Sequence, residues 1–208
     1  MARETFWNVI AKKYARDPVA DQPSYERKLA MTQALLRPEM HLLEMGCGTG
    51  TTALYHAPKV AKIDALDFSK AMIGIARDKA ASRGISNVDF RIGSFADLPA
   101  TPQYDMALGL SLLHLLDDAG AGVAALAGQV KPGGYVVTST VCMGDMTGLM
   151  PKVVPWIGKL GLIPKVLLVK RDDLIAAHRA AGLEIVDEFR PRPDASVFLI
   201  GQKPVMPV

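Results

Sequence analysis

The chain has only two cysteines among its 208 residues, Cys47 and Cys142, and they lie far apart. Neither a disulfide framework nor the close Cys and His spacing of a metal site is present, so we expect no metal and a reducing compartment. No apolar run approaches the roughly 18 residues that a membrane-spanning helix requires. The first residues are charged, at Arg3 and Glu4, and show no apolar signal-peptide core. These absences favour a cytoplasmic protein.

An excess of one charge is also lacking. The sequence has 24 Lys and Arg against 21 Asp and Glu, which gives a net charge of +3 and a pI near 8.8. So thin an excess gives no strong case for nucleic-acid binding. No internal repeat and no linker is visible, and a 50% hydrophobic composition is ample for one core. We therefore expect a single domain over residues 1–208.

What the sequence does contain is a glycine-rich turn at residues 41–50, His-Leu-Leu-Glu-Met-Gly-Cys-Gly-Thr-Gly. Its apolar residues are typical of a parallel strand that is buried on both faces. Gly46, Gly48 and Gly50 then permit positive φ and let a ligand approach the backbone. A helix can begin directly after the turn, with its first N–H groups facing a bound ligand.

The spacing of the turn distinguishes two ligand classes. The dinucleotide fingerprint G-x-G-x-x-G requires a further glycine where this chain has Thr51, which disfavours a nicotinamide dehydrogenase. With Glu44 two residues before the first glycine, the stretch instead resembles motif I, E/D-x-G-x-G-x-G, of the class I S-adenosylmethionine-dependent methyltransferases. The resemblance implies that Glu44 approaches the amino group of the cofactor, and that Gly46, Cys47, Gly48 and Gly50 pass under its methionyl part.

A second acid stands at the end of the next expected strand, residues 62–67. A carboxylate at Asp67 is placed to accept the two ribose hydroxyls, as in other doubly wound folds, and it resembles the family's motif II acid. Phe68 and Met72 follow where the family often lays apolar side chains against the adenine, although either could equally belong to the core. Ser69 is a good N-cap for a helix that extends to about residue 81.

The third expected strand, residues 87–93, leads into Gly-Ser-Phe-Ala-Asp-Leu-Pro at 93–99. The family commonly has G-D-A-x-x-L-P here, and its Asp takes the adenine amino group. In this chain Ser94 occupies that position. The Ser94 hydroxyl can still accept a hydrogen bond, the Phe95 N–H could reach a ring nitrogen, and Asp97 is a candidate substitute acid.

The fourth expected strand begins at Tyr104 and is apolar from Met106 to Leu110, as in a central parallel strand. Open α/β sheets bind ligands at the carboxyl ends of their strands, so Leu110 to His114 should border the pocket. His114 could act as a general base or could simply be a packed residue. The other three histidines carry no functional signal and are expected at surface or boundary positions; they are His41, His56 and His178.

Two segments lie outside the strand–helix alternation. Residues 1–37 predict two helices, at 3–15 and 24–36, the second with Ser24 as its N-cap. The resemblance implies that this helical cap folds over the cofactor, which makes Tyr14 and Tyr25 candidates for the substrate pocket, or else packed aromatics. Residues 142–171 interleave Met, Trp and aliphatic residues with lysines and prolines. They predict a substrate lid, a cover for the core, or a contact with a membrane surface or a second subunit.

A Lys-Pro-Gly-Gly turn at 131–134, before a fifth strand at 135–140, completes an ordered set of family marks between residues 41 and 140. The resemblance implies a Rossmann-like α/β fold, with a seven-stranded, mostly parallel sheet, an antiparallel last strand and helices on both faces. It also implies methyl transfer from S-adenosylmethionine to a partly apolar small molecule, similar to the ubiquinone and menaquinone biosynthesis enzymes. A non-catalytic S-adenosylmethionine-binding protein and an RNA methyltransferase are the alternatives. The acceptor and the oligomeric state stay open.

Overall fold

The structure is a computed structural model that describes residues 3–159 and 163–205. It divides into two compact units, one from Arg3 to Leu98 and one from Pro99 onward. The expectation of a single domain over residues 1–208 stays a prediction. Within the described residues, no helix combines the length and apolar character needed to cross a bilayer.

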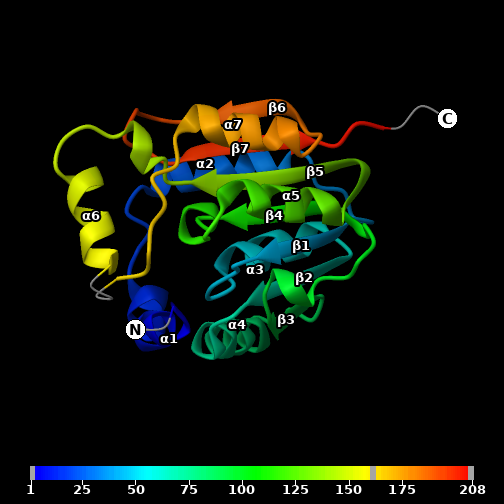
Figure 1. Cartoon of the computed structure of the whole chain (residues 1–208). Coiled ribbons are helices and arrows are strands. Elements are labelled where there is room, and N and C mark those ends of the chain that lie inside the picture. Colours follow the sequence, from blue (N-terminus) through cyan, green and yellow to red (C-terminus); the bar gives the residue numbers. More distant parts are fainter. Residues whose placement is uncertain (1–2, 160–162, 206–208) are drawn as a thin grey trace. The chain divides into compact units, whose positions relative to one another are not determined.

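The N-terminal unit contains three parallel strands, β1 (His41–Met45), β2 (Lys62–Asp67) and β3 (Val88–Ile92), with β2 in the middle. The apolar run of β1 is buried, as both Leu42 and Leu43 are 0% exposed. The helices of this unit are α1 (Arg3–Arg16), α2 (Gln22–Gln33), α3 (Thr51–His56) and α4 (Lys70–Ser82), with short 3-10 turns η1 (Ala57–Lys59) and η2 (Phe95–Asp97). In Figure 1, α1 and α4 lie together, and α4 also packs against β2 and β3.

The C-terminal unit contains β4 (Tyr104–Leu110), β5 (Val130–Thr140), β6 (Glu184–Phe189) and β7 (Val197–Gln202). β4 and β5 are parallel, whereas β7 runs antiparallel to both β5 and β6. Its helices are α5 (Ala119–Gln129), α6 (Met150–Lys159) and α7 (Arg171–Ala180), with 3-10 turns η3 (Leu113–Leu115) and η4 (Met143–Asp145). Figure 1 shows α5 beside α7, while α6 stands away from the strands of this unit.

The seven strands have the order β3-β2-β1-β4-β5-β7-β6 in the sheet. β7, the last strand along the chain, runs antiparallel to its neighbours β5 and β6. This confirms the predicted Rossmann-like class with a mostly parallel sheet. The active edge of such a sheet is the carboxyl end of its parallel strands. Glu44, Asp67 and Leu110 all lie at or near that end of their strands.

Two local expectations were wrong in detail. The N-cap of α2 is Asp21, whose side chain accepts the N–H of Ser24, because Pro23 occupies the first turn and the helix starts earlier than its apolar pattern suggests. The strand assigned as β5 starts at Val130, ahead of the expected turn. Its pairing with β4 is irregular before Tyr135, since residues 131–134 bulge out of the ladder.

The expectation that His56 and His178 lie at the surface or boundary was also wrong. They are 1% and 0% exposed. His178 bonds to Thr138 through Nε2 (3.1 Å) and to the carbonyl of Leu174 through Nδ1 (2.8 Å), so it acts as a packed polar residue. His56 has no hydrogen bond from either ring nitrogen among the described residues, and burial lowers its pKa to about 4.

Candidate functional site

The turn after β1 uses each of its three glycines in the left-handed region. φ is +68° at Gly46, +54° at Gly48 and +73° at Gly50. A Cβ on Gly50 would also lie only 2.7 Å from the ring of Phe90 and 2.8 Å from the Cβ of Ala76. Gly50 therefore permits close packing of the turn on β3 and α4, which is the part that the third glycine plays in a dinucleotide fingerprint.

The carboxylate of Asp67 is tied to this turn. One oxygen accepts the N–H of Gly48 (3.0 Å) and the other accepts the N–H of Ser69 (2.8 Å). Burial raises the pKa of Asp67, and the two N–H groups oppose that rise. Each oxygen keeps a lone pair, so the same carboxylate can hold the turn and still accept a ligand hydroxyl.

Glu44 is the most unusual group of the N-terminal unit. It is 4% exposed, and no described residue forms a hydrogen bond with its carboxyl group. Burial raises its pKa to about 8, and the nearby charge of Asp67 adds to the rise. A buried acid without a partner is costly unless a cation or a donor reaches it. The pair of acids beside the glycine turn therefore fits a ligand that carries a positive group.

Helix α1 lies over the same turn. The side-chain oxygen of Asn8 accepts the hydroxyl of Ser69 (2.7 Å) and the N–H of Ala71 (3.1 Å), which fixes α1 to the start of α4. Further along α1, Cε1 of Tyr14 is the only described atom within 4 Å of a Cβ placed on Gly48. Burial raises the pKa of the Tyr14 phenol, and Asp67 and Glu44 raise it further, although 52% of the residue is exposed. The phenol thus keeps its proton and lies close enough to the two acids for their charges to act on it.

Tyr25, the second predicted pocket residue, shares a hydrogen bond of 3.2 Å with the hydroxyl of Thr52 and so connects α2 to α3. Burial raises the pKa of its phenol as well. Both tyrosines therefore stay protonated at neutral pH. They are suited to donating hydrogen bonds rather than to accepting protons.

The adenine-side residues divide into two groups. Ser94 donates its hydroxyl (3.0 Å) and its N–H (2.8 Å) to one oxygen of Asp97, so the substitute acid lies directly beside the serine. Both residues are exposed, and Phe95 is half-buried next to them. Phe68 is half-buried at the end of β2, whereas Met72 is 2% exposed and belongs to the packed face of α4.

Lys79 is a contributor that the sequence did not indicate. Its ammonium donates to the hydroxyls of Thr49 (2.9 Å) and Thr51 (3.2 Å), which fixes the glycine turn from the side of α4. Asn8 is a second contributor that the sequence did not indicate. Both residues act across distances of about 30 residues or more in the chain, and no local motif announces such contacts.

Two predicted site residues belong to the C-terminal unit. Leu110 ends β4, and Ser111 after it has φ +54°, the only positive value at a described residue other than glycine. His114 lies in η3 and is 9% exposed; its Nδ1 has no hydrogen-bond partner among the described residues. Burial lowers the pKa of His114 to about 4, so the imidazole is neutral near pH 7.

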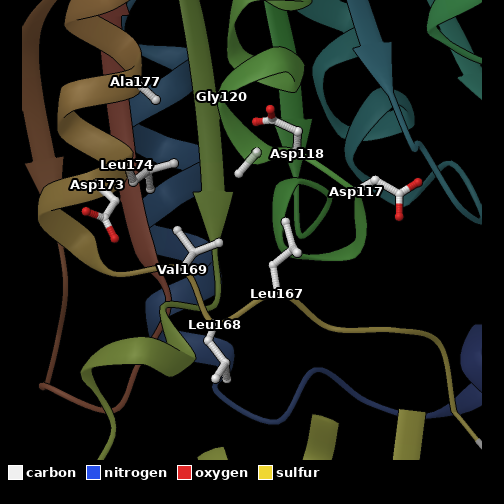
Figure 2. A pocket seen from close by; sticks show the side chains of 10 residues that line it. Asp117, Asp118, Gly120, Leu167, Leu168, Val169, Asp173, Leu174 and Ala177 are labelled. Atoms are coloured by element: carbon white, nitrogen blue, oxygen red, sulfur yellow. The ribbon is translucent and has the colours of Figure 1, made fainter. Parts of the chain in front are cut away.

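A cavity of about 380 Å³ opens in the C-terminal unit between α5, α7 and the chain that precedes α7 (Figure 2). Apolar side chains such as Leu167 and Leu174 line it together with the carboxylates of Asp117, Asp118 and Asp173. None of the predicted site residues lines this cavity. We therefore do not place the cofactor there.

Comparison with known proteins agrees with this geometry. The family "Methyltransferase domain" matches residues 42–134. A ubiquinone biosynthesis O-methyltransferase of Sinorhizobium fredii is 27% identical over 87% of this chain and 73% of its own length. The enzyme of the same name from Bordetella pertussis is 30% identical over 69% of this chain and 61% of its own length.

Solved structures share the fold. The [4+2]-cyclase SpnF matches with a TM-score of 0.79 at 20% identity, over 97% of this chain and 95% of its own. The N-methyltransferase NodS of Bradyrhizobium japonicum matches with a TM-score of 0.67 at 14% identity, over 88% and 96%. At such low identity these likenesses speak for the fold alone.

This chain is similar in motifs, sequence and sheet order to the class I S-adenosylmethionine-dependent methyltransferases. It is an enzyme of methyl transfer, and S-adenosylmethionine is its cofactor. The site residues fit that molecule on two counts. Glu44 is a buried acid without a partner beside a second acid, and the face of Gly48 is open except for Tyr14.

Proposed function

We propose that this enzyme methylates a small, partly apolar molecule at a nucleophilic atom, an oxygen in the first instance. The observation that carries the proposal is the exit of β4. Ser111 holds a left-handed conformation there, which costs about 1–3 kcal/mol in a residue other than glycine and is typical of functional sites. Leu112 and Leu113 follow with the neutral His114. An apolar segment with one imidazole that can take a proton suits an apolar substrate whose hydroxyl must lose its proton when it is methylated.

The names of the relatives agree with this proposal, since ubiquinone biosynthesis O-methyltransferases act at oxygen. Bound S-adenosylmethionine supplies a methyl group on a sulfonium that departs as a neutral thioether. The protein therefore has to align the acceptor and exclude water rather than activate a leaving group.

We assign the cofactor contacts to the N-terminal unit. Glu44 holds the ammonium group, the turn from Gly46 to Gly50 carries the methionyl part, and Asp67 accepts the ribose hydroxyls while it holds Gly48 in place. On the adenine side, Ser94 donates to Asp97, so the free oxygen of Asp97 replaces the family's acid as the acceptor for the amino group. Phe68 and Phe95 supply apolar contact.

We assign acceptor chemistry to His114, Tyr14 and Tyr25. The neutral imidazole of His114 can take a proton from a hydroxyl as the oxygen attacks. The two tyrosines, whose phenols keep their protons, donate hydrogen bonds that orient the acceptor.

The test begins with a panel of phenols, catechols and quinols, each with and without an alkyl chain, incubated with the enzyme and S-adenosylmethionine. The proposal predicts a mass gain of one methyl group, greatest for the alkylated compounds. Binding of the cofactor without methylation of any compound would favour the non-catalytic alternative. Methylation of RNA alone would favour the other alternative.

The role of His114 is tested with the best phenol found and a nitrophenol that is already ionised at the assay pH. His114→Ala should lower the rate with the phenol, by less than the roughly 10²- to 10⁴-fold typical of a base whose pKa lies near the assay pH, because burial lowers the pKa of His114 to about 4. It should affect the nitrophenolate far less. An equal loss with both acceptors would contradict the assignment of a base.

A further inference from the structure

The small positive charge of the whole chain is concentrated in one segment. Residues 146–170 contain four lysines and neither Asp nor Glu, so the segment carries +4 and the rest of the chain carries 3 − 4 = −1. The lysines are Lys152, Lys159, Lys165 and Lys170. Such a run without acids, between Asp145 and Asp172, is a strong local departure from the near-neutral balance of the remaining sequence.

The helix in this segment exposes apolar side chains. Leu149 is 72% exposed, Met150 62% and Trp156 69%, while Val154 is 9% exposed. Leu149 directly precedes α6, and the N–H of Val153 donates to its carbonyl (3.0 Å). Leu149, Val153 and Trp156 therefore recur at i, i+4 and i+7 and form one stripe at the start of the helix. We call Leu149, Met150, Lys152, Val153 and Trp156 the α6 surface.

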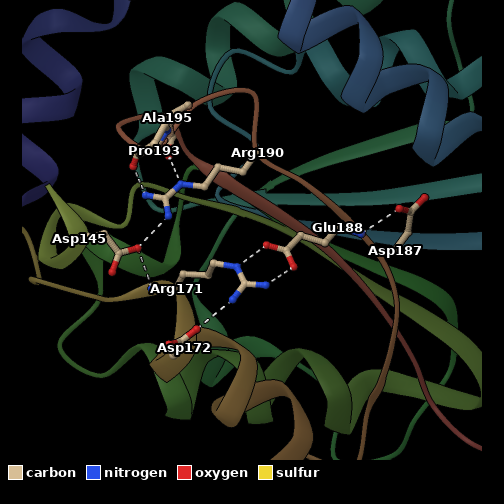
Figure 3. Close-up of polar contacts among 8 residues, drawn as sticks. All are labelled: Asp145, Arg171, Asp172, Asp187, Glu188, Arg190, Pro193 and Ala195. Atoms are coloured by element: carbon tan, nitrogen blue, oxygen red, sulfur yellow. Dashed lines mark hydrogen bonds and ion pairs between the residues drawn. The ribbon is translucent and has the colours of Figure 1, made fainter.

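The base of the segment is held firmly, as Figure 3 shows. Asp145 accepts the backbone N–H of Arg171 (3.1 Å) and a guanidinium N–H of Arg190 (2.9 Å). Arg171 in turn binds both oxygens of Glu188 on β6, at 2.5 and 2.6 Å. Ion pairs of this bidentate kind are the strong ones. They join the two ends of the segment to each other and to the sheet of this unit.

The backbone closes the same base. The N–H of Gly144 donates to the carbonyl of Val169 (2.9 Å), and a Cβ on Gly144 would lie 2.7 Å from the carbonyl of Leu168. The N–H of Leu167 donates to the carbonyl of His114 (2.8 Å), so the returning strand of chain lies against η3. These contacts tie together the two ends of the segment that carries the α6 surface.

We propose that the α6 surface docks on an anionic lipid bilayer. A short amphipathic helix with Trp and aliphatic residues on one side and lysines beside them is the pattern of an interfacial helix. Tryptophan favours the boundary between headgroups and acyl chains, and an exposed lysine such as Lys152 gains from the negative surface potential. The absence of any acid in residues 146–170 makes the segment complementary to anionic headgroups.

A second copy of the chain is a poorer partner for this surface. A two-fold symmetric dimer places the same patch of each subunit against itself, which would bring two acid-free, lysine-bearing segments together. Like charges that meet across an interface oppose association. The inference goes beyond the proposed function, and its test does not depend on methyl transfer.

The experiment is co-sedimentation of the full chain with vesicles of phosphatidylcholine alone and of phosphatidylcholine mixed with phosphatidylglycerol. The wild-type protein should bind the anionic vesicles, weakly or not at all the neutral ones, and should be released by salt. Lys152→Glu and Trp156→Ser should each weaken binding about tenfold. Matched controls are Lys59→Glu, at an exposed lysine in the other unit, and Val186→Ser, at a half-exposed valine on β6. Both controls should bind as the wild type does.

A second readout follows Trp156 directly. In a Trp7→Phe background Trp156 is the only tryptophan, and its emission should shift to the blue with anionic vesicles alone. Equal binding of wild type, Lys152→Glu and Trp156→Ser would overturn the proposal. So would concentration-dependent dimerisation that shifts the emission of Trp156 without any vesicle binding.

Discussion

The raised pKa of Glu44 predicts that binding of S-adenosylmethionine releases a proton from the protein. Its carboxyl group has a pKa of about 8 in the free protein, because it is buried beside Asp67. At pH 7 an acid with this pKa is protonated in about 0.9 of the molecules. If Glu44 holds the ammonium group of S-adenosylmethionine, it must be ionised in the complex. Binding at pH 7 should then release about 0.9 proton for each cofactor bound, and at pH 9 only about 0.1.

Calorimetric titration of S-adenosylmethionine in phosphate and in Tris at the same pH measures this number, because the two buffers differ in their heat of ionisation. The matched variant is Glu44→Gln, which keeps the shape of the side chain and cannot titrate. Subtracting its proton count removes any contribution from the ligand's own amino group. S-adenosylhomocysteine, which has the same amino group, should give the same difference.

The expected difference between the wild type and Glu44→Gln is about 0.9 proton at pH 7. Binding by Glu44→Gln should also be weaker, since a neutral amide replaces a charge-assisted partner. If both proteins release the same number of protons, Glu44 does not change its ionisation on binding. The assignment of Glu44 to the ammonium group would then be wrong.

Three further predictions concern residues that the structure alone singles out. The pKa of His56 is about 4 in the folded state and about 6.5 in the unfolded state, so the unfolded state binds more protons between these pH values and the free energy of unfolding falls as pH falls. Urea unfolding should show that this free energy falls from pH 7 to pH 5 by about 2 kcal/mol less in His56→Gln than in the wild type, and equal falls would contradict the burial argument. Lys79→Met should weaken S-adenosylmethionine binding severalfold in the same calorimetry, and Lys79→Arg much less, because the ammonium group holds Thr49 and Thr51 in place. Unchanged affinity in Lys79→Met would show that the glycine turn holds its shape without the Lys79 ammonium. Gly50→Ala should lower the free energy of unfolding by about 2–4 kcal/mol and Gly84→Ala by only about 1 kcal/mol, since both have positive φ but only Gly50 faces close neighbours, and equal losses would refute the packing role.

The parts of the fold that the sequence predicts well are those with local causes. The apolar run of β1, the positive φ of the three glycines and the N-cap at Ser69 all follow from residues within one turn or strand of each other. The position of Asp67 at the end of β2 follows from the same alternation of strand and helix. These local signals are enough to place the glycine turn and its two acids.

The rest of the site depends on contacts between distant residues. Asn8 reaches Ser69 across 61 positions, and no spacing rule indicates which polar residue of α1 will do so. The left-handed Ser111 is invisible in the sequence because serine carries no preference for that conformation. The burial of Glu44 beside Asp67, which raises the pKa of its carboxyl group, is likewise a property of the folded environment.

The measurement that tests the account most directly is a comparison of S-adenosylmethionine, S-adenosylhomocysteine and NAD as ligands of the purified chain, by calorimetry. The account predicts binding of both sulfur compounds in the micromolar range, about −8 kcal/mol, and no binding of NAD. Asp67→Ala should reduce both affinities sharply. Binding of NAD in preference to the sulfur compounds, or full affinity in Asp67→Ala, would contradict the assignment of the glycine turn and its acids to S-adenosylmethionine.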